Sequence, residues 1–217
     1  MNTQTHILVA AALFTEPGQR SRNIAALAGG FIPDLPIYSL WLWSKINAIP
    51  EHTVWREMYW SDPWKSLVDA SHSIPIYLAL LLIGMFALTR PQPPTVPAGA
   101  TLSARWHASV RQMTPLTIFA LAGLTHIAGD FPVHVADAHA HFWPLSDWRF
   151  HSPVSYWDPA HYGRWFSLFE ITLGVSLAVI IFRRFQAWWV RGLMVAATIA
   201  YFAVPAYFIL VVGHHQP

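Results

Sequence analysis

Apolar residues are gathered into six segments of the chain, and shorter polar stretches separate them. The segments lie near residues 5–16, 24–43, 73–89, 114–132, 166–182 and 192–213. A membrane-crossing helix needs about 20 predominantly apolar residues, which the last segment reaches comfortably, whereas the first is short. The pattern predicts an all-α fold, a polytopic membrane helical bundle with about five to six membrane segments. We expect one integral membrane domain over 1–217, with an extended Pro-rich loop at 90–104 and two additional helices within 166–213.

The second apolar segment is interrupted by the stretch "FIPDLPIY", in which Asp34 stands between Pro33 and Pro36. A proline inside a helix removes a backbone hydrogen bond and clashes with the preceding turn. Irregular backbone at membrane depth persists only where protein buries it or where it lines a polar cavity. The stretch therefore predicts a membrane segment broken at Pro33–Asp34. The Asp34 carboxylate is equally well explained as a helix cap or as a ligand.

The composition supports a membrane protein and excludes several kinds of site. Hydrophobic residues make up 54% of the chain and charged residues only 11%, whereas soluble domains carry about 25% charged residues. The chain has no cysteine, which rules out disulfides, thiolate ligands and a thiol nucleophile. Basic residues form no cluster suited to tracking phosphates, so we expect no nucleic-acid partner.

The distribution of Lys and Arg predicts the orientation in the membrane. Eight of these residues fall within 17–23, 90–113 and 183–191, and five fall within 44–72 and 133–165. Because basic loops stay on the cytoplasmic side, the first set is assigned to the cytoplasm. We expect a bacterial inner (plasma) membrane protein whose second set of loops faces the outer side.

Side chains able to bind a metal lie at or near the outer ends of four separate segments. They are His6, Asp34, His72, His126 and Asp130. His126 and Asp130 are four residues apart and share one helical face. Ionisable groups inside membrane segments are costly and are usually functional. A divalent ion bound by imidazole and carboxylate accounts for all five, with zinc favoured over manganese or iron and one or two ions expected. A hydrogen-bonded His–Asp pair that joins two helices is the alternative.

Titratable residues of the outer loop are further candidates for metal binding or catalysis. In "DAHAHF", Asp137, His139 and His141 alternate and would share one side of an extended strand, where they suit a second metal, proton transfer or simple solvation. For catalysis we single out Asp69 or His139 as the group that moves a proton. Arg149, or alternatively Arg164, is the group expected to hold a phosphate.

Several short motifs occur in a characteristic order. "TH" opens an apolar helix, "PD" ends one, "HS" precedes another, and "LTHIAGD" is followed by "FWPLSDWRF". Over residues 1–150 this order resembles the YdjM-like family of membrane-bound metal-dependent hydrolases, which is distantly similar to zinc phospholipases C and related nucleases. The resemblance implies a metal-site core within 1–150, a hydrolase activity, and metal ligands at the five positions named above.

The sequence departs from the family pattern at two places. The second acidic residue expected shortly after "PD" is replaced by Pro36, and a histidine expected five residues before His72 is replaced by Leu67. Either Asp69, His134, His139 or His141 substitutes for them, or the site binds fewer ions.

The expected function is a membrane-embedded metal-dependent hydrolase, with a phosphoester as the favoured substrate. Membrane lipids are the expected partners, and a lipid-linked phosphoester suits a site at this depth. A non-catalytic protein that binds or transports a metal ion or protons is the main alternative. Haem ligation by paired histidines is disfavoured, because an aspartate four residues after a histidine suits a hard or borderline ion better.

Overall fold

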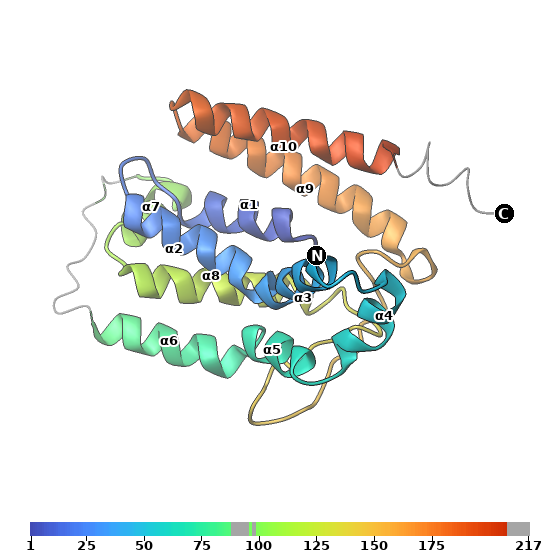
Figure 1. Cartoon of the computed structure of the whole chain (residues 1–217). Coiled ribbons are helices and arrows are strands. Elements are labelled where there is room, and N and C mark those ends of the chain that lie inside the picture. Colours follow the sequence, from blue (N-terminus) through green and yellow to red (C-terminus); the bar gives the residue numbers. More distant parts are fainter. Residues whose placement is uncertain (88–95, 97–98, 208–217) are drawn as a thin grey trace.

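The computed structural model describes residues 1–87, 96 and 99–207, and this part of the chain is all-helical (Figure 1). Most of residues 90–98 in the Pro-rich loop, and residues 208–213 of the last apolar segment, lie outside the described residues. The helices are α1 (Thr3–Phe14), α2 (Arg20–Phe31), α3 (Leu35–Ile46), α4 (Glu51–Arg56), α5 (Trp64–Ser71), α6 (Ile74–Phe86), α7 (Leu102–Val110), α8 (Pro115–Asp130), α9 (Gly163–Arg184) and α10 (Trp188–Tyr207), with single 3₁₀ turns η1 (Ile32–Asp34), η2 (Met58–Trp60) and η3 (Pro159–His161).

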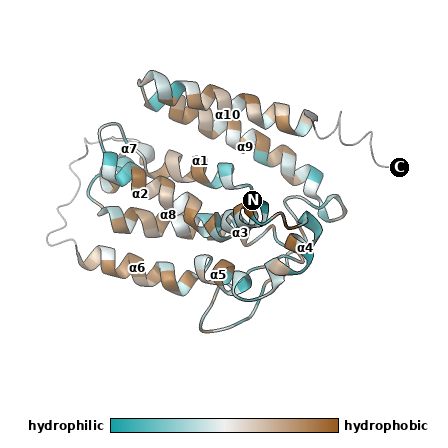
Figure 2. Ribbon diagram, in the orientation of Figure 1, coloured by the Kyte–Doolittle hydropathy of each residue, from teal (hydrophilic) through white to brown (hydrophobic). Residues whose placement is uncertain are grey.

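Three helices of the described chain are long and apolar enough to cross a membrane, as expected for an integral membrane protein. They are Arg20–Ile46, Gly163–Arg184 and Trp188–Ala206, and a fourth span results if the bent pair α5 and α6 is counted as one. The helices α1, with 12 residues, and α8, with 16, are shorter than the roughly 20 residues that a complete crossing needs. Hydrophobic residues run along α6, α8 and α10, and hydrophilic residues are frequent around α4 (Figure 2).

The main bend in a membrane segment lies at a different place from the one that the prolines predict. At Pro33 the backbone tightens into η1 and continues directly as α3, so that α2 and α3 together form one 27-residue candidate span. Pro33 and Pro36 each stand in the first turn of a new helical segment, where a missing N–H leaves no hydrogen bond unmade. The sharper break, 45°, separates α5 from α6 at His72 and Ser73. The Ser73 hydroxyl caps α6 by accepting a hydrogen bond from the Ile76 amide at 3.2 Å.

Helix α8 lies at the centre of the bundle, in contact with α1, α2 and α6 (Figure 1). Small residues bring these helices close together. A Cβ on Gly29 of α2 would lie 2.7 Å from Cβ of Ala122 in α8, and a Cβ on Gly123 would overlap the ring of Tyr77 in α6. Close approach through glycine and alanine is a common way for helices to associate in membranes, where burial from water gives no driving force. The pair α9 and α10 packs on the outside of α1.

The connection between α8 and α9 crosses one end of the bundle, and η3 is its only helical turn among the described residues. Backbone hydrogen bonds order it: the Ser152 amide donates to the His134 carbonyl at 2.9 Å, and the Tyr156 amide donates to the Val133 carbonyl at 3.0 Å. This loop covers the end of the bundle at which α1 begins and α8 finishes (Figure 1). The candidate site lies at that end.

Candidate metal centre

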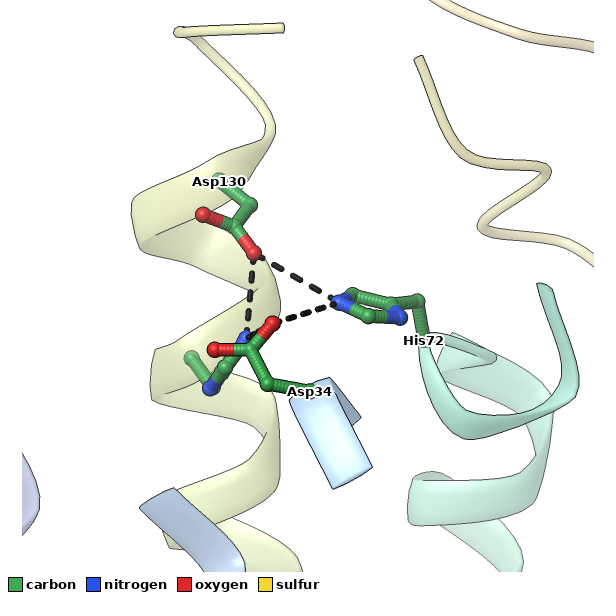
Figure 3. Close-up of side chains that lie close together, drawn as sticks. Asp34, His72 and Asp130 are labelled. Carbon is green, nitrogen blue, oxygen red and sulfur yellow. Dashed lines mark ion pairs between the residues drawn. The ribbon is translucent and has the colours of Figure 1, made fainter. Parts of the chain in front are cut away.

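The alternating direction of the helices brings residues from four separate stretches to one end of the bundle. His6 lies in the first turns of α1, Asp34 ends η1, His72 occupies the break between α5 and α6, and His126 and Asp130 lie in the last turns of α8. All five side chains are buried. Figure 3 shows Asp34 and Asp130 pointing from two different elements towards the imidazole of His72.

Four of the five predicted ligands form one compact group. Asp34, His72, His126 and Asp130 each offer a ligand atom, and these atoms all lie within 4.8 Å of one another. Nε2 of His72 lies 3.8 Å from Oδ1 of Asp34 and 3.6 Å from Oδ2 of Asp130. Nε2 of His126 lies 3.6 Å and 3.0 Å from the same two oxygens. This group of four is referred to below as the primary group, and it could hold a metal ion.

The histidines of the primary group are oriented as metal ligands are. Nδ1 of His72 donates to the Val68 carbonyl and Nδ1 of His126 to the Gly30 carbonyl, both at 2.9 Å. These bonds place the proton on Nδ1 and leave the lone pair on Nε2, the arrangement that outer partners impose on ligating imidazoles. Both Nε2 atoms are buried and make no hydrogen bond, although carboxylate oxygens lie near them. Rings and carboxylates therefore lie within ion-pair distance of one another around a common point (Figure 3), and a cation at that point would bind both.

A second group shares Asp130 with the first. Asp130, His134 and His139 offer ligand atoms that also lie within 4.8 Å of one another. Nε2 of His134 lies 3.4 Å from Oδ1 of Asp130, and its Nδ1 lies 3.0 Å from Oδ2 of Asp137. Burial, followed by the nearby His72 and His134, lowers the pKa of His139 well below its usual value, so the ring is neutral. Asp130 thus turns one oxygen to each group, as a carboxylate between two ions would.

His6 lies beside these groups but is not a member of either. Its Nε2 is 2.9 Å from Oδ1 of Asp130, and its ring stacks on His126 with 3.6 Å between ring centroids. The Met1 amino group also contacts Asp130, and the Thr3 hydroxyl donates to Oδ2 of Asp34 at 2.5 Å. The first turn of α1 therefore supports the carboxylates of the primary group. A ligand role for His6 remains a prediction.

Asp69 and Arg149 lie outside the cavity and engage each other. The Arg149 guanidinium donates to both oxygens of Asp69, at 2.9 and 2.6 Å. Asp69 also accepts from the Ala140 amide at 3.0 Å, and Arg149 donates to the Ala138 carbonyl at 2.9 Å. These bonds fasten the backbone on both sides of His139 to α5. Asp69 and Arg149 therefore hold the loop in position, and the catalytic role expected of them stays a prediction.

His141 also serves the backbone. Its Nδ1 donates to the His72 carbonyl at 3.2 Å, and its own carbonyl accepts from the Ile74 amide at 2.8 Å. Burial lowers the pKa of His141 to about 4. This residue connects the loop to the break between α5 and α6, and it belongs to neither metal-binding group.

A cavity of about 350 Å³ opens onto the two groups. Its floor contains Asp34, Asp130, His134 and His139, and its walls are formed by Ile37, Tyr38, Trp41, Trp55, Tyr156 and the segment Met1–Gln4. No lysine or arginine is among these lining residues. Two of the tryptophans, Trp41 and Trp55, thus line the cavity, and no sequence signal placed them there.

Glu170 is a further buried carboxylate, and the structure shows what it binds. Its two oxygens accept from the backbone amide and the side-chain amide of Asn2, each at 2.6 Å. Glu170 thus holds the start of α1 against α9. No sequence signal linked these two residues, which are 168 positions apart.

No protein family, curated protein or solved structure matches the chain. The chemistry of the site therefore follows from its own residues.

Proposed function

We propose that the protein is a metal-dependent hydrolase embedded in a membrane, and that it cleaves phosphoesters at the membrane surface. The ion is zinc, since nitrogen and oxygen ligands in a compact, buried set of four are typical of zinc sites. Membership of the YdjM-like family is part of the proposal, and the order of the motifs from "TH" to "FWPLSDWRF" supports it.

One observation carries the proposal: Asp130 stands between two groups of buried imidazoles whose Nε2 atoms make no hydrogen bond within the described part of the chain. Nε2 of His72, His126 and His134 has no hydrogen-bond partner, and leaving such polar atoms unpaired in a protein interior costs about 1–3 kcal/mol each. A purely structural His–Asp cluster would use these atoms for hydrogen bonds. The Nε2 atoms of these histidines point towards the carboxylate of Asp130, which supports ion binding.

The residues around the cavity would have different roles in hydrolysis. An ion bound there would acidify a water molecule and stabilise charge on a phosphoester. Asp34 and Asp130 balance the charge of that ion, and the backbone carbonyls of Val68 and Gly30 keep the imidazoles aligned. Since no lysine or arginine is among the residues that line the cavity, the negative charge of a phosphate would be offset chiefly by the metal.

The number of ions decides the role of His139. With one ion in the primary group, the neutral ring of His139, whose buried Nδ1 has no hydrogen-bond partner, is the group that accepts a proton from the attacking water. With two ions, His134 and His139 would help to hold the second one, and Asp130 would serve both groups.

We further propose that the site faces the outer side of a bacterial inner membrane and that α1 and α8 complete a set of five to six membrane segments. Basic side chains at the opposite end of the bundle support this orientation. Arg22 donates to the Met113 carbonyl at 2.7 Å, and Arg184 donates to the Thr15 carbonyl at 3.0 Å. Basic residues at one end and metal-binding residues at the other fit a cytoplasmic face and an outer face.

The test is hydrolysis by the purified full-length protein in lipid nanodiscs, with zinc or manganese added. Soluble phosphomonoesters and phosphodiesters and long-chain phosphoester lipids are the substrates. We expect metal-dependent turnover that falls by at least about a hundredfold in His126→Ala, because loss of a ligand exceeds the ten- to hundredfold effect of losing an outer partner. The control is His161→Ala, which removes a partly exposed histidine paired with Asp158 at 2.7 Å. Stoichiometric metal without turnover of any ester would overturn the catalytic proposal.

That outcome would favour a protein that binds a metal ion or protons without catalysis. Among the described residues, however, buried titratable side chains gather at the site end of the bundle, and the buried polar groups near the other end are the hydroxyls of Thr15 and Thr117. A transport pathway needs polar groups along its whole length. This distribution favours a one-sided site.

A further inference from the structure

A second, larger cavity lies beside the metal-site cavity, on the side of the bundle that α9 and α10 form. This second cavity, called the groove below, has a volume of about 680 Å³. It is lined from α1 by Ile7 and Leu8, from α9 by Ser167, Glu170 and Ile171, and from α10 by Leu193, Met194, Ala197, Ala200, Tyr201, Val204 and Pro205. Asn2 and Gln4 line this groove and the metal-site cavity alike. The two spaces therefore adjoin at the start of α1.

The groove is largely apolar because most of its polar side chains are already paired. Both oxygens of Glu170 are engaged by Asn2. The Tyr201 hydroxyl lies 2.5 Å from the Thr5 hydroxyl, which ties α10 to α1. What remains for an occupant is the apolar surface of leucine, isoleucine, methionine, alanine and valine side chains. Ala197 and Ala200 leave room where larger residues would fill the space.

The length of the groove matches one leaflet of a membrane. Its α10 residues run from Leu193 to Pro205, twelve residues apart, which corresponds to about 18 Å along a helix axis. Half of the roughly 30 Å hydrocarbon core is about 15 Å. Both α9 and α10 are candidate membrane spans, so the medium beside the groove is hydrocarbon and not water.

We propose that this groove holds a hydrocarbon chain of a phosphoester lipid whose head group occupies the metal-site cavity. The inference deepens the proposed function and rests on it for the identity of the head group. The chain enters sideways from the outer leaflet between α1, α9 and α10. Asn2, fixed by Glu170, and the exposed Gln4 mark the boundary at which chain meets head group. The substrate class is therefore a membrane lipid with at least one long chain, in preference to a soluble phosphoester.

The first arm of the test locates the chain directly and needs no activity. The full-length protein in nanodiscs is photolabelled with a phosphatidic acid that carries a diazirine at the middle of one acyl chain, and the labelled residues are identified by mass spectrometry. We expect labels on groove residues of α10, loss of those labels in Ala197→Trp and Ala200→Trp, and their retention in Ile199→Trp. Ile199 lies on the same helix, is 61% exposed and does not line the groove.

The second arm measures selectivity as the ratio of kcat/KM for a long-chain phosphoester to kcat/KM for a soluble one. Filling the groove displaces the head group, and a misplacement of about 1 Å can cost on the order of a hundredfold. We expect the ratio to fall tenfold or more in Ala197→Trp and Ala200→Trp and to stay unchanged in Ile199→Trp.

The two arms separate the failure of the groove from the failure of the hydrolase. Labels on α3 near Tyr38 and Trp41, or spread evenly over the outer faces of α9 and α10, would overturn the groove proposal even if esters are hydrolysed. An unchanged ratio in both groove variants would do the same. Groove labelling without turnover of any ester would uphold the chain site and refute the proposed activity.

Discussion

The bonds at Asp69 offer a quantitative test of how the loop that carries His134 and His139 is held over the site. Asp69 is 4% exposed and accepts hydrogen bonds from Arg149 and from the Ala140 amide, and Nζ of Lys65 lies 3.1 Å away. Replacing it by alanine leaves two cations without their counter-charge. We expect Asp69→Ala to lower the free energy of unfolding and to loosen the metal-binding residues of the loop.

The magnitude follows from the burial of the partners. Breaking a buried ion pair by removing one partner costs about 3–5 kcal/mol. The Arg149 side chain keeps 24% of its surface in contact with solvent, so part of its charge stays hydrated, and we expect a value near the lower bound, about 3 kcal/mol. Metal affinity should fall about ten- to hundredfold, the usual effect of losing an outer partner of the ligands.

Thermal unfolding in detergent and competition with a zinc chelator measure the two effects. Asp158→Ala is the matched control, because it removes a partly exposed aspartate that caps η3 and pairs with His161, and it should cost only about 1 kcal/mol, the usual effect of losing a helix cap. The double variant Asp69→Ala/Arg149→Ala should cost less than the sum of the two single changes, since the residues share one interaction. Additive costs, or zinc affinity equal to that of the wild type in Asp69→Ala, would refute the positioning role.

Three further predictions concern the bundle and its site. Gly29→Ala should destabilise the protein by about 1–3 kcal/mol because the new Cβ would press on Ala122. The control Gly192→Ala, with nothing within 4 Å of the new atom, should be neutral or stabilising. Equal effects of the two changes in thermal unfolding would disprove the tight packing of α2 on α8. Thr5→Ala should lower the free energy of unfolding by about 1–3 kcal/mol because it leaves the Tyr201 hydroxyl unpaired. Adding Tyr201→Phe should recover part of that stability. An unfolding curve that shows no recovery would contradict this prediction. Removing bound metal with a chelator should lower stability by about 2.7 kcal/mol if the ion had been present at a hundred times its Kd, and an unchanged melting temperature would argue against a buried ion.

The arrangement of the primary group was partly predictable from the sequence, because helix direction alternates along the chain. His126 and Asp130 share a helical face by their spacing, and Asp34 and His72 come from the ends of neighbouring segments. Once the helices pack in antiparallel order, these ends meet, and the structure brings all four together. The break at His72 was not predictable, since Pro33 and Pro36 looked like the stronger helix breakers.

Sequence patterns could not predict the contacts of the outer loop. The loop has no helical or strand period, so nothing in the sequence shows which of its histidines turns inward. His139 stacks on His72 with 4.0 Å between ring centroids, whereas His141 bonds to the backbone. The partners Asp69 and Arg149 are 80 residues apart, and a pairing at that distance depends on the whole fold. The same holds for Asn2 and Glu170.

Metal content tests the central claim most directly. The measurement uses detergent-purified full-length protein without a histidine tag, for the wild type, for the double variant His126→Ala/Asp130→Ala, and for His161→Ala/Asp158→Ala as a matched surface pair. The account predicts one or two stoichiometric divalent ions in the wild type and in the surface variant, and none in the site variant. Absence of metal from folded wild-type protein, even after zinc or manganese is added back, would contradict it.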